Sequence, residues 1–223
     1  MGITFQENHL AATTTRELLD LISGLNGDPK IHGILVQLPL PADINRQKII
    51  EAINPVKDVD GLTPENIGLL VSGAPRFVPC TPLGIVTLLK ENHIALNRHV
   101  VIVGRSNIVG RPLAILLSQK EINATVTLCH TGTEKLGKHT GRADILVVAA
   151  GQPGLITADM VKKNAVVVDV GIHRQKNGSW SGDVDFESVK KVAAAITPVP
   201  GGVGPMTVMM LLNNAVEAAS RQL

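Results

Sequence analysis

Hydrophobic side chains near the start of the chain recur every three or four residues, which is the spacing of one helix face. The members of this face are Leu18, Leu19, Ile22 and Leu25. Thr14 and Glu17 precede them with the spacing of a capping box, and residues 26–29 are expected to end the helix. A second helix is predicted over residues 45–53, and the apolar run 31–37 predicts a buried strand between the two helices. These elements already indicate an α/β fold.

The alternation of apolar runs and helical spacing becomes regular from Thr81 onward. Thr81 and Pro82 are typical of the N-cap and first turn of a helix, which we expect to extend to Glu91. Strands are predicted at residues 99–103, 124–128, 144–149 and 165–170, with helical segments between the first three and a shorter spacer before the last. A final helix is predicted over residues 205–221, whereas residues 54–79 are predicted to be mostly loop. Such alternation is typical of a parallel, doubly wound sheet.

Composition and charge favour small-molecule partners. The 223 residues carry 21 basic and 19 acidic side chains, a net charge of +2, which gives no electrostatic basis for binding nucleic acid or an anionic membrane. The chain has no tyrosine and one tryptophan, and no apolar run approaches the roughly 20 residues that a membrane helix needs. Cys80 and Cys129 lack the spacing of a zinc site or a disulfide framework. We therefore expect a cytoplasmic protein with reduced thiols and no metal.

The segment Gly104–Pro112, GRSNIVGRP, directly follows a predicted strand and precedes a predicted helix. This is the arrangement that directs backbone N–H groups at a phosphate, although serine replaces the second glycine of the strict dinucleotide motif. The next strand is followed by His130 and Thr131 rather than by an acidic residue that would bind a ribose 2′-hydroxyl, while Arg105 could meet a 2′-phosphate. This combination favours NADP over NAD. The alternatives from the residues alone are a structural turn and a solvated surface arginine.

Three further segments combine polar groups with turn residues. Lys57–Gly61, KDVDG, places two carboxylates in a loop without the remaining ligands of a calcium site, which favours a hydrogen-bonding role or an Asp-Gly turn. Gln37 is expected at the carboxyl end of a strand, where it either lines a site or caps loop carbonyls. The glycine-rich run 200–207 leads into a helix N-terminus, which either receives a ligand or closes a loop.

Taken together, six motifs resemble those of the bifunctional methylenetetrahydrofolate dehydrogenase/methenyltetrahydrofolate cyclohydrolase family. They are VQLPLP, KDVDG, PCTPxG, GRSxxVGxP, DVGI and TPVPGGVGPMT, and the match covers essentially the whole chain. The resemblance implies a partial α/β folate-binding domain at residues 1–79 and an NADP-binding Rossmann domain at residues 80–204. It also implies that the helix at residues 205–223 packs back on the first domain.

The resemblance also implies roles for individual residues. Gln37 would orient a catalytic lysine, and Asp60 would form a hydrogen bond with the pterin ring. Substrate contacts are implied for Val36, Gln37, Leu38, Asp60, Pro200, Gly201, Gly202, Val203, Gly204, Pro205, Met206, Thr207 and Val208. NADP contacts are implied for Gly104, Arg105, Ser106, Thr131 and Ile172, with threonine at position 131 where the family often has serine.

The chemistry implied by the resemblance is oxidation of 5,10-methylenetetrahydrofolate with NADP, followed by hydrolysis to 10-formyltetrahydrofolate without a metal. The implied setting is cytoplasmic one-carbon metabolism that serves purine biosynthesis, in a homodimer whose partners are tetrahydrofolate derivatives. Family members carry a Tyr-x-x-x-Lys motif in an N-terminal segment, and these 223 residues contain no tyrosine. The alternative is therefore a catalytically incomplete, NADP-binding regulator or remnant, and the 223 residues alone are expected to bind NADP with little turnover.

Overall fold

The computed structural model describes residues 2–10 and 12–222. The chain divides into two compact units, one formed by the residues up to Val78 with those from Leu211 onward, the other by Pro79–Met210. Among the described residues, no helix combines the length and apolar character needed to cross a membrane.

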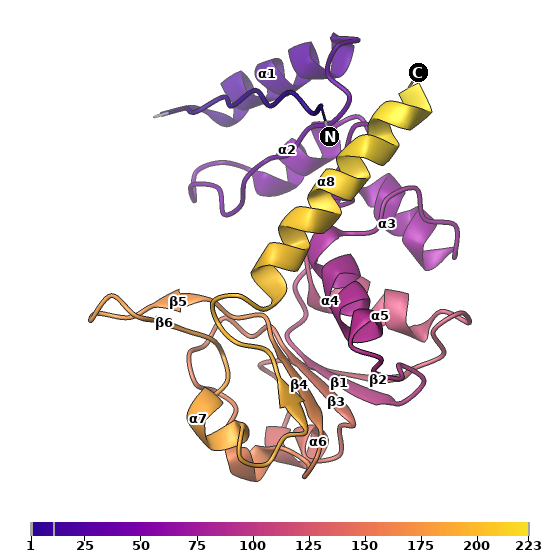
Figure 1. Ribbon diagram of the computed structural model, residues 1–223. Coiled ribbons are helices and arrows are strands. Elements are labelled where there is room, and N and C mark those ends of the chain that lie inside the picture. The colour runs from indigo at the N-terminus through magenta and orange to yellow at the C-terminus, as the bar shows by residue number, and fades with distance from the viewer. Residues whose placement is uncertain (1, 11, 223) are drawn as a thin grey trace. The chain divides into compact units, whose positions relative to one another are not determined.

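The first unit is built mainly from helices. They are α1 (Thr15–Gly27), α2 (Arg46–Ala52), α3 (Pro64–Val71) and the last part of α8 (Val203–Gln222) (Figure 1). The predicted capping box is present, because Glu17 N donates to Thr14 Oγ1 at 3.2 Å while the Glu17 carboxylate accepts from Thr14 N at 2.8 Å. Leu18, Ile22 and Ile49 are buried in the core between α1 and α2, so both predicted helices are confirmed.

Two predictions for the first unit are wrong. Residues 31–37 are extended but do not form a strand. Among the described residues this segment makes a single bridge, Ile34 to Asp58, and no hydrogen-bonded ladder. The segment 54–79, expected to be mostly loop, contains α3. Its start follows capping rules, because Thr63 accepts from Asn66 N and Pro64 stands at the first helical position.

The second unit contains a five-stranded sheet in the order β2-β1-β3-β4-β7, and every pair in it is parallel. The strands are β1 (His99–Val103), β2 (Thr125–Cys129), β3 (Ile145–Val148), β4 (Val166–Asp169) and β7 (Ala195–Ile196). The four predicted strands agree with β1 to β4 within one residue at each end. The fifth strand of this sheet, β7, has two residues and is too short for the hydrophobic pattern to indicate.

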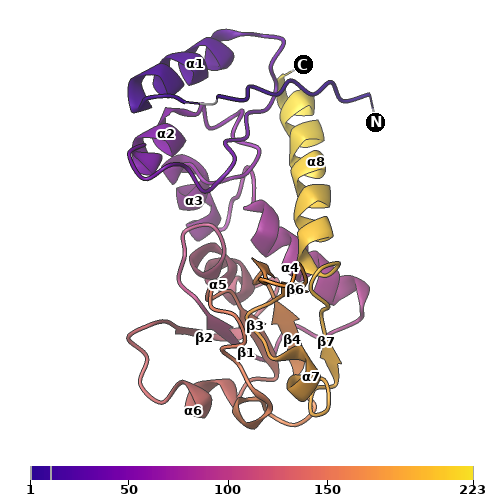
Figure 2. The ribbon, with the colours of Figure 1, turned by 90° about the vertical axis from the view of Figure 1, so that its left-hand side faces the viewer.

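Helices cover both faces of this sheet. The chain passes from β1 through α5 (Gly110–Ser118) to β2, and then returns through α6 (Leu136–Thr140) to β3 on the other side of β1. Because crossovers between parallel strands are right-handed, this reversal places α5 and α6 on opposite faces. Both views of the second unit show α4 (Cys80–Glu91) with α5 on one face and α6 on the other (Figures 1 and 2). The predicted doubly wound, Rossmann-like sheet is confirmed.

The ends of two helices differ from the prediction. Helix α4 begins at Cys80 with Pro79 in the N-cap position and no side-chain cap, so Thr81 is not the N-cap. Helix α8 begins at Val203, two residues before the expected start at Pro205. The sequence signal was ambiguous at both places, because proline is accepted anywhere in the first turn of a helix, where its missing N–H would be unpaired anyway.

The second unit is completed by short elements after β3. They are the 3-10 helix η1 (Ala158–Met160), the antiparallel pair β5 (His173–Arg174) and β6 (Trp180–Ser181), and α7 (Phe186–Val189). Fully buried valines, leucines and isoleucines of β1, β3 and β4 form most of the core, together with Ile156 and Val189. This core holds the carboxyl ends of the parallel strands at one edge, where the loops that follow them lie together.

Candidate functional site

The glycine turn after β1 lies at the point where the strand order reverses. Strands β1 and β3 are neighbours, while the chain leaves β1 toward β2 on the other side, which is where open α/β sheets bind ligands. Gly104 has φ +124°, and a Cβ at this position would come within 2.8 Å of the Ala149 carbonyl carbon. A Cβ at Gly110 would come within 2.7 Å of the Gly104 carbonyl carbon. Both glycines are therefore required by close backbone approach, as in dinucleotide-binding turns.

The rest of the turn presents polar groups to solvent. Ser106 Oγ accepts from Val109 N at 3.1 Å, so this serine closes the turn with its side chain. Within residues 2–10 and 12–222, no group accepts a hydrogen bond from the N–H of Ser106 or Asn107. Arg105 is exposed, and no partner for its guanidinium lies in the described part of the chain. Exposed N–H groups and a guanidinium beside a helix start are the groups that bind phosphates.

The loop after β2 is a tight polar turn. His130 N donates to Thr133 Oγ1 at 2.8 Å, and Gly132 N donates to His130 Nδ1 at 3.0 Å. Thr131 stands exposed at the tip of this turn, and residues 130–133 contain no carboxylate, since the first acid of the loop is Glu134, after the turn. The position that binds a ribose 2′-hydroxyl in NAD-binding sheets therefore carries a hydroxyl instead of an acid.

The loop after β4 holds Ile172, which is 60% exposed, next to two buried carboxylates. Asp169 ends β4 and accepts hydrogen bonds from the N–H groups of Gly171, Asp183 and Val184. Burial raises the pKa of Asp169 above its usual value, although these three hydrogen bonds oppose the shift. The hydrogen bonds to Asp169 therefore hold the backbone of this loop, while the side chain of Ile172 faces solvent.

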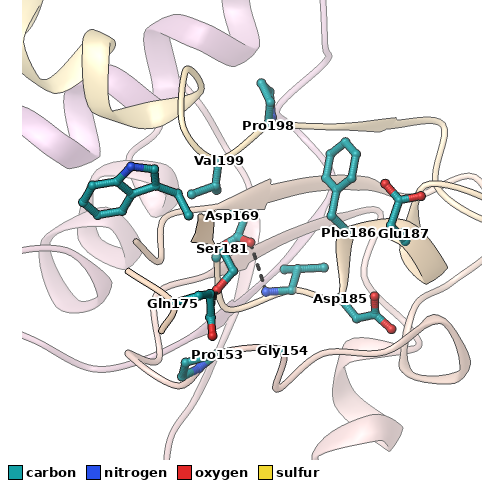
Figure 3. Close-up of a pocket in the computed structure, with 13 residues that line it drawn as sticks. Pro153, Gly154, Asp169, Gln175, Ser181, Asp185, Phe186, Glu187, Pro198 and Val199 are labelled. Carbon is teal, nitrogen blue, oxygen red and sulfur yellow. Dashed lines mark hydrogen bonds between the residues drawn. The ribbon is translucent and has the colours of Figure 1, made fainter. Parts of the chain in front are cut away.

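A cavity of about 530 Å³ opens beside the carboxyl ends of β4 and β7. Figure 3 shows Asp169 at its floor, with a hydrogen bond from the Val184 N–H, and Pro198 and Val199 along its rim. None of the predicted NADP or folate contacts lines this cavity. The glycine turn, by contrast, has the geometry that binds a phosphate group.

In the first unit, hydrogen bonds hold the part of the KDVDG loop that precedes Asp60. Lys57 is 5% exposed, and its Nζ donates to the carbonyls of three residues at the end of α1, at 2.8 to 3.1 Å. Asp58 is also buried and accepts from Thr63 N and Asn66 Nδ2, both at 2.8 Å. Asn214 of α8 donates to Val59 O at 2.9 Å. Asp60 is partly exposed at the end of this rigid segment.

Gln37 lies in an extended segment that continues through the cis peptide bond Leu38–Pro39. Its side chain is exposed, and Gln37 Nε2 donates to Leu38 O at 3.2 Å. Val36 and Leu38 are half-buried on either side, with Val36 against the α1–α2 core. The carboxamide oxygen of Gln37 receives no hydrogen bond from the described residues and is available to a ligand or a cation.

The predicted substrate loop 200–208 is only partly a loop. Pro200, Gly201 and Gly202 form a turn in which Gly201 has φ +105° and a Cβ at Gly202 would come within 2.6 Å of Pro198 O. From Val203 onward the residues belong to α8, so Gly204, Pro205, Met206, Thr207 and Val208 are helical. Val208 is 56% exposed, and Thr207 Oγ1 lies 3.1 Å from Thr81 Oγ1.

The predicted residues thus fall into two groups. Val36, Gln37, Leu38 and Asp60 belong to the first unit, and all of the others belong to the second. Within the second unit, the loops after β1, β2 and β4 bring Gly104, Arg105, Ser106, Thr131 and Ile172 to the carboxyl edge of one sheet. Among the described residues, no set of three or more histidine, cysteine, aspartate or glutamate side chains is placed to hold a metal ion.

Comparison with known proteins decides the family. Residues 79–223 match the model of the tetrahydrofolate dehydrogenase/cyclohydrolase NAD(P)-binding domain, and residues 1–60 match the model of the catalytic domain of the same family. The chain belongs to the tetrahydrofolate dehydrogenase/cyclohydrolase family. The bifunctional protein FolD of Bacillus subtilis is 53% identical over 225 residues, which cover 100% of this chain and 79% of that protein. FolD of Syntrophus aciditrophicus is 59% identical, over 91% of this chain and 72% of that protein.

Solved structures of the family have the same fold. The FolD dehydrogenase/cyclohydrolase of Campylobacter jejuni superposes with a TM-score of 0.90 at 52% identity, covering 95% of this chain and 75% of that one. The enzyme of Trypanosoma brucei, solved with NADP and an inhibitor, gives a TM-score of 0.87 at 40% identity, covering 94% and 73%. The predicted family and the α/β fold class are confirmed. The chain is a methylenetetrahydrofolate dehydrogenase/cyclohydrolase of folate one-carbon metabolism, and the alternative of a non-catalytic NADP-binding protein is not favoured.

Proposed function

We propose that this protein oxidises 5,10-methylenetetrahydrofolate with NADP and then hydrolyses the methenyl product to 10-formyltetrahydrofolate. The observation that carries the proposal is the match of both family domains along the chain, together with 53% identity to a bifunctional relative over 100% of it. The oxidation removes a hydride from the one-carbon bridge, and water then adds to the methenyl carbon. Both steps need the folate held in one fixed position.

The second unit holds NADP, which supplies the acceptor for the hydride. Gly104 and Gly110 allow close approach of a pyrophosphate to the start of α5, where the N–H groups of Ser106 and Asn107 are available. Arg105 pairs with the 2′-phosphate, and Thr131 contacts the same ribose with its hydroxyl. Ile172, largely exposed after β4, contacts the other half of the cofactor. The absence of an acid in the turn after β2 supports NADP over NAD.

The first unit holds the pteridine of the folate. Asp60 accepts hydrogen bonds from the ring, and its position is fixed because Lys57 and Asp58 on one side are buried and fully bonded. Gln37 orients the catalytic lysine through its available amide oxygen, and Val36 and Leu38 form apolar walls. The turn at Pro200–Gly202 and the first residues of α8, Val203 to Val208, contribute the remaining substrate contacts.

In the domain organisation that we propose, residues 1–79 bind folate, residues 80–204 bind NADP, and residues 205–223 complete the folate-binding unit. The last part is supported by Asn214, which donates to Val59 O and Val78 O, and by Ala218, which is buried against Phe77. We further propose a cytoplasmic homodimer that supplies one-carbon units for purine biosynthesis. These assignments rest on the family and on the balanced charge of +2.

The proposal is tested with the full-length protein, methylenetetrahydrofolate and either NADP or NAD. We expect NADPH to form and 10-formyltetrahydrofolate to accumulate, with a much lower kcat/KM for NAD. Asp43→Asn is a suitable matched control, because Asp43 is an exposed aspartate of the first unit outside the proposed site. Binding of NADP without any oxidation of the folate would instead support a protein that only binds the nucleotide.

A further inference from the structure

Asp183 is a buried carboxylate to which the dehydrogenase chemistry assigns no role. Its side chain is 0% exposed, although it lies only two residues after the antiparallel β5–β6 pair. A buried carboxylate is retained in a fold only when several donors compensate for the lost hydration. The donors to Asp183 come from two different loops.

The first loop follows β3. Asp183 Oδ2 accepts from Ala150 N at 2.6 Å and from Gly151 N at 2.9 Å. The residue before them, Ala149, is the one whose carbonyl group touches Gly104 in the glycine turn. Asp183 therefore fixes the two residues that follow this contact, in the loop after β3, on the side of β1 away from β2.

The second loop follows β4. Asp183 Oδ1 accepts from the Nε2–H of His173 at 2.7 Å, and His173 is the residue after Ile172. A Cβ at Gly171 would come within 2.6 Å of Asp183 N and closer still to the carboxylate, so only glycine fits there. The Asp183 carboxylate thus bonds one neighbour of Ile172 and packs closely against the other, while the Ile172 side chain stays exposed.

Asp183 is itself held in place by Asp169 at the end of β4. Asp169 accepts from Asp183 N at 2.9 Å and from Val184 N at 3.0 Å, and Asp169 N donates to Thr197 Oγ1 at 2.8 Å. The two carboxylates therefore form a continuous chain of hydrogen bonds from the sheet to both loops. These hydrogen bonds link strand β4 to the loops after β3 and β4, which are not strands of the parallel sheet.

We propose that Asp183 is a positioning residue for the nicotinamide half of the cofactor, an inference that rests on the proposed NADP function. In a doubly wound sheet the adenosine half lies toward β2 and the other half toward the strands beyond the switch point, here β3 and β4. The loops held by Asp183 follow β3 and β4, and neither belongs to the turn that contains Arg105. Asp183 therefore acts on one half of NADP and leaves the other half unaffected.

The test compares two ligands on the same protein. NADP spans both halves of the site, whereas adenosine 2′,5′-bisphosphate occupies only the adenosine half. In Asp183→Asn the amide replaces one acceptor oxygen by a donor, which faces either the loop N–H groups or His173. We expect the Kd for NADP to rise about tenfold, the scale of one hydrogen bond to a charged group, while the Kd for adenosine 2′,5′-bisphosphate scarcely changes.

The controls separate positioning from general stability. Asp144→Asn changes a carboxylate of the same unit just before β3, at the opposite edge of the sheet, and should leave both affinities unchanged. His173→Gln, which leaves the bonds to Ala150 and Gly151 in place, should weaken NADP by less than Asp183→Asn and serves if that variant does not fold.

Equal losses for both ligands, or no loss of NADP affinity, would overturn the positioning role while the proposed function stands. Wild-type protein that binds neither ligand would overturn the proposed function, and the positioning role with it.

Discussion

At the scale of one residue, we propose that Arg105 determines the choice between the two nicotinamide cofactors. Its guanidinium is exposed beside the glycine turn and has no partner among the described residues, so it is available to a 2′-phosphate. We expect Arg105→Ala to weaken NADP binding by about 1.5–3 kcal/mol and to leave NAD binding nearly unchanged. Calorimetric titration with both cofactors measures this, with the exposed Arg142→Ala as control. Equal losses for NADP and NAD would show that Arg105 acts through the turn rather than through the phosphate.

We propose that Asp60 recognises the folate. The neighbouring Lys57 and Asp58 are buried and bonded, so replacing Asp60 should change the ligand contact without unfolding the loop. We expect Asp60→Asn to weaken folate binding at least about tenfold, because an acceptor becomes a donor, and to leave NADP affinity intact. Fluorescence titration of both ligands measures the difference, and Asp43→Asn is the control. Unchanged folate affinity would mean that KDVDG is only a turn.

Lys57 joins two elements of the first unit. It donates to Leu25 O, Asn26 O and Asp28 O, which are carbonyl groups at the end of α1 that the helix itself leaves unpaired. Lys57→Met should lower the free energy of unfolding by about 2–3 kcal/mol, because three partly buried carbonyls lose a bond to a charged donor. Lys48→Met, on the exposed face of α2, should stay within about 0.5 kcal/mol of wild type in the same urea titration. Similar values for both variants would contradict this account.

The Asp144–Lys162 ion pair gives a pH dependence at the start of β3. A hydrogen bond from Lys162, at 2.6 Å, and a weaker one from His99 N lower the pKa of Asp144 below its usual value of 3.8. A lowered carboxyl pKa contributes stability that is present above the unfolded value and lost as pH falls through the folded value. Wild type should therefore be more stable than Asp144→Asn at neutral pH. The difference in urea midpoints should be full above pH 3.8, decline as pH falls from 3.8 through the lower pKa of the folded state, and vanish below that pKa; a constant difference across this range would exclude the ion pair as its cause.

The sequence predicted elements best where a repeating pattern coincides with a local end signal. Helix α1, with its capping box, and strands β1 to β4 follow from spacing alone. The prediction of a strand at residues 31–37 was wrong. An apolar run indicates burial but not whether a second strand lies beside it, and among the described residues this segment makes a single bridge. Helix α3 was missed although Thr63 and Pro64 form a recognisable helix start, which the surrounding turn residues concealed.

Candidate site residues were predictable where the chemistry is local. Gly104 and Arg105 are neighbours in the glycine turn, so their spacing carried the information. Asp183 was missed because its partners, Ala150, Gly151 and His173, come from two loops that only the sheet order brings together. No periodicity in the sequence encodes that arrangement; its only trace is the glycine at positions 171 and 182, where a side chain would collide with a carboxylate.

At the scale of the whole molecule, the chain combines a helical unit that carries the proposed folate contacts with a parallel-sheet unit that carries the proposed NADP contacts. Family relatives match along both units, which supports one reaction that uses both ligands. A protein that only bound NADP would need nothing from the KDVDG loop, yet that loop is among the most heavily bonded parts of the first unit.

Direct hydride transfer is the measurement that tests this account most closely. The full-length protein is mixed with NADP and with 5,10-methylenetetrahydrofolate deuterated at the one-carbon bridge, and the NADPH formed is analysed by mass spectrometry. The account predicts that the NADPH carries one deuterium derived from the bridge and that 10-formyltetrahydrofolate appears with it. NADPH without deuterium, or bound NADP that is never reduced, would contradict it.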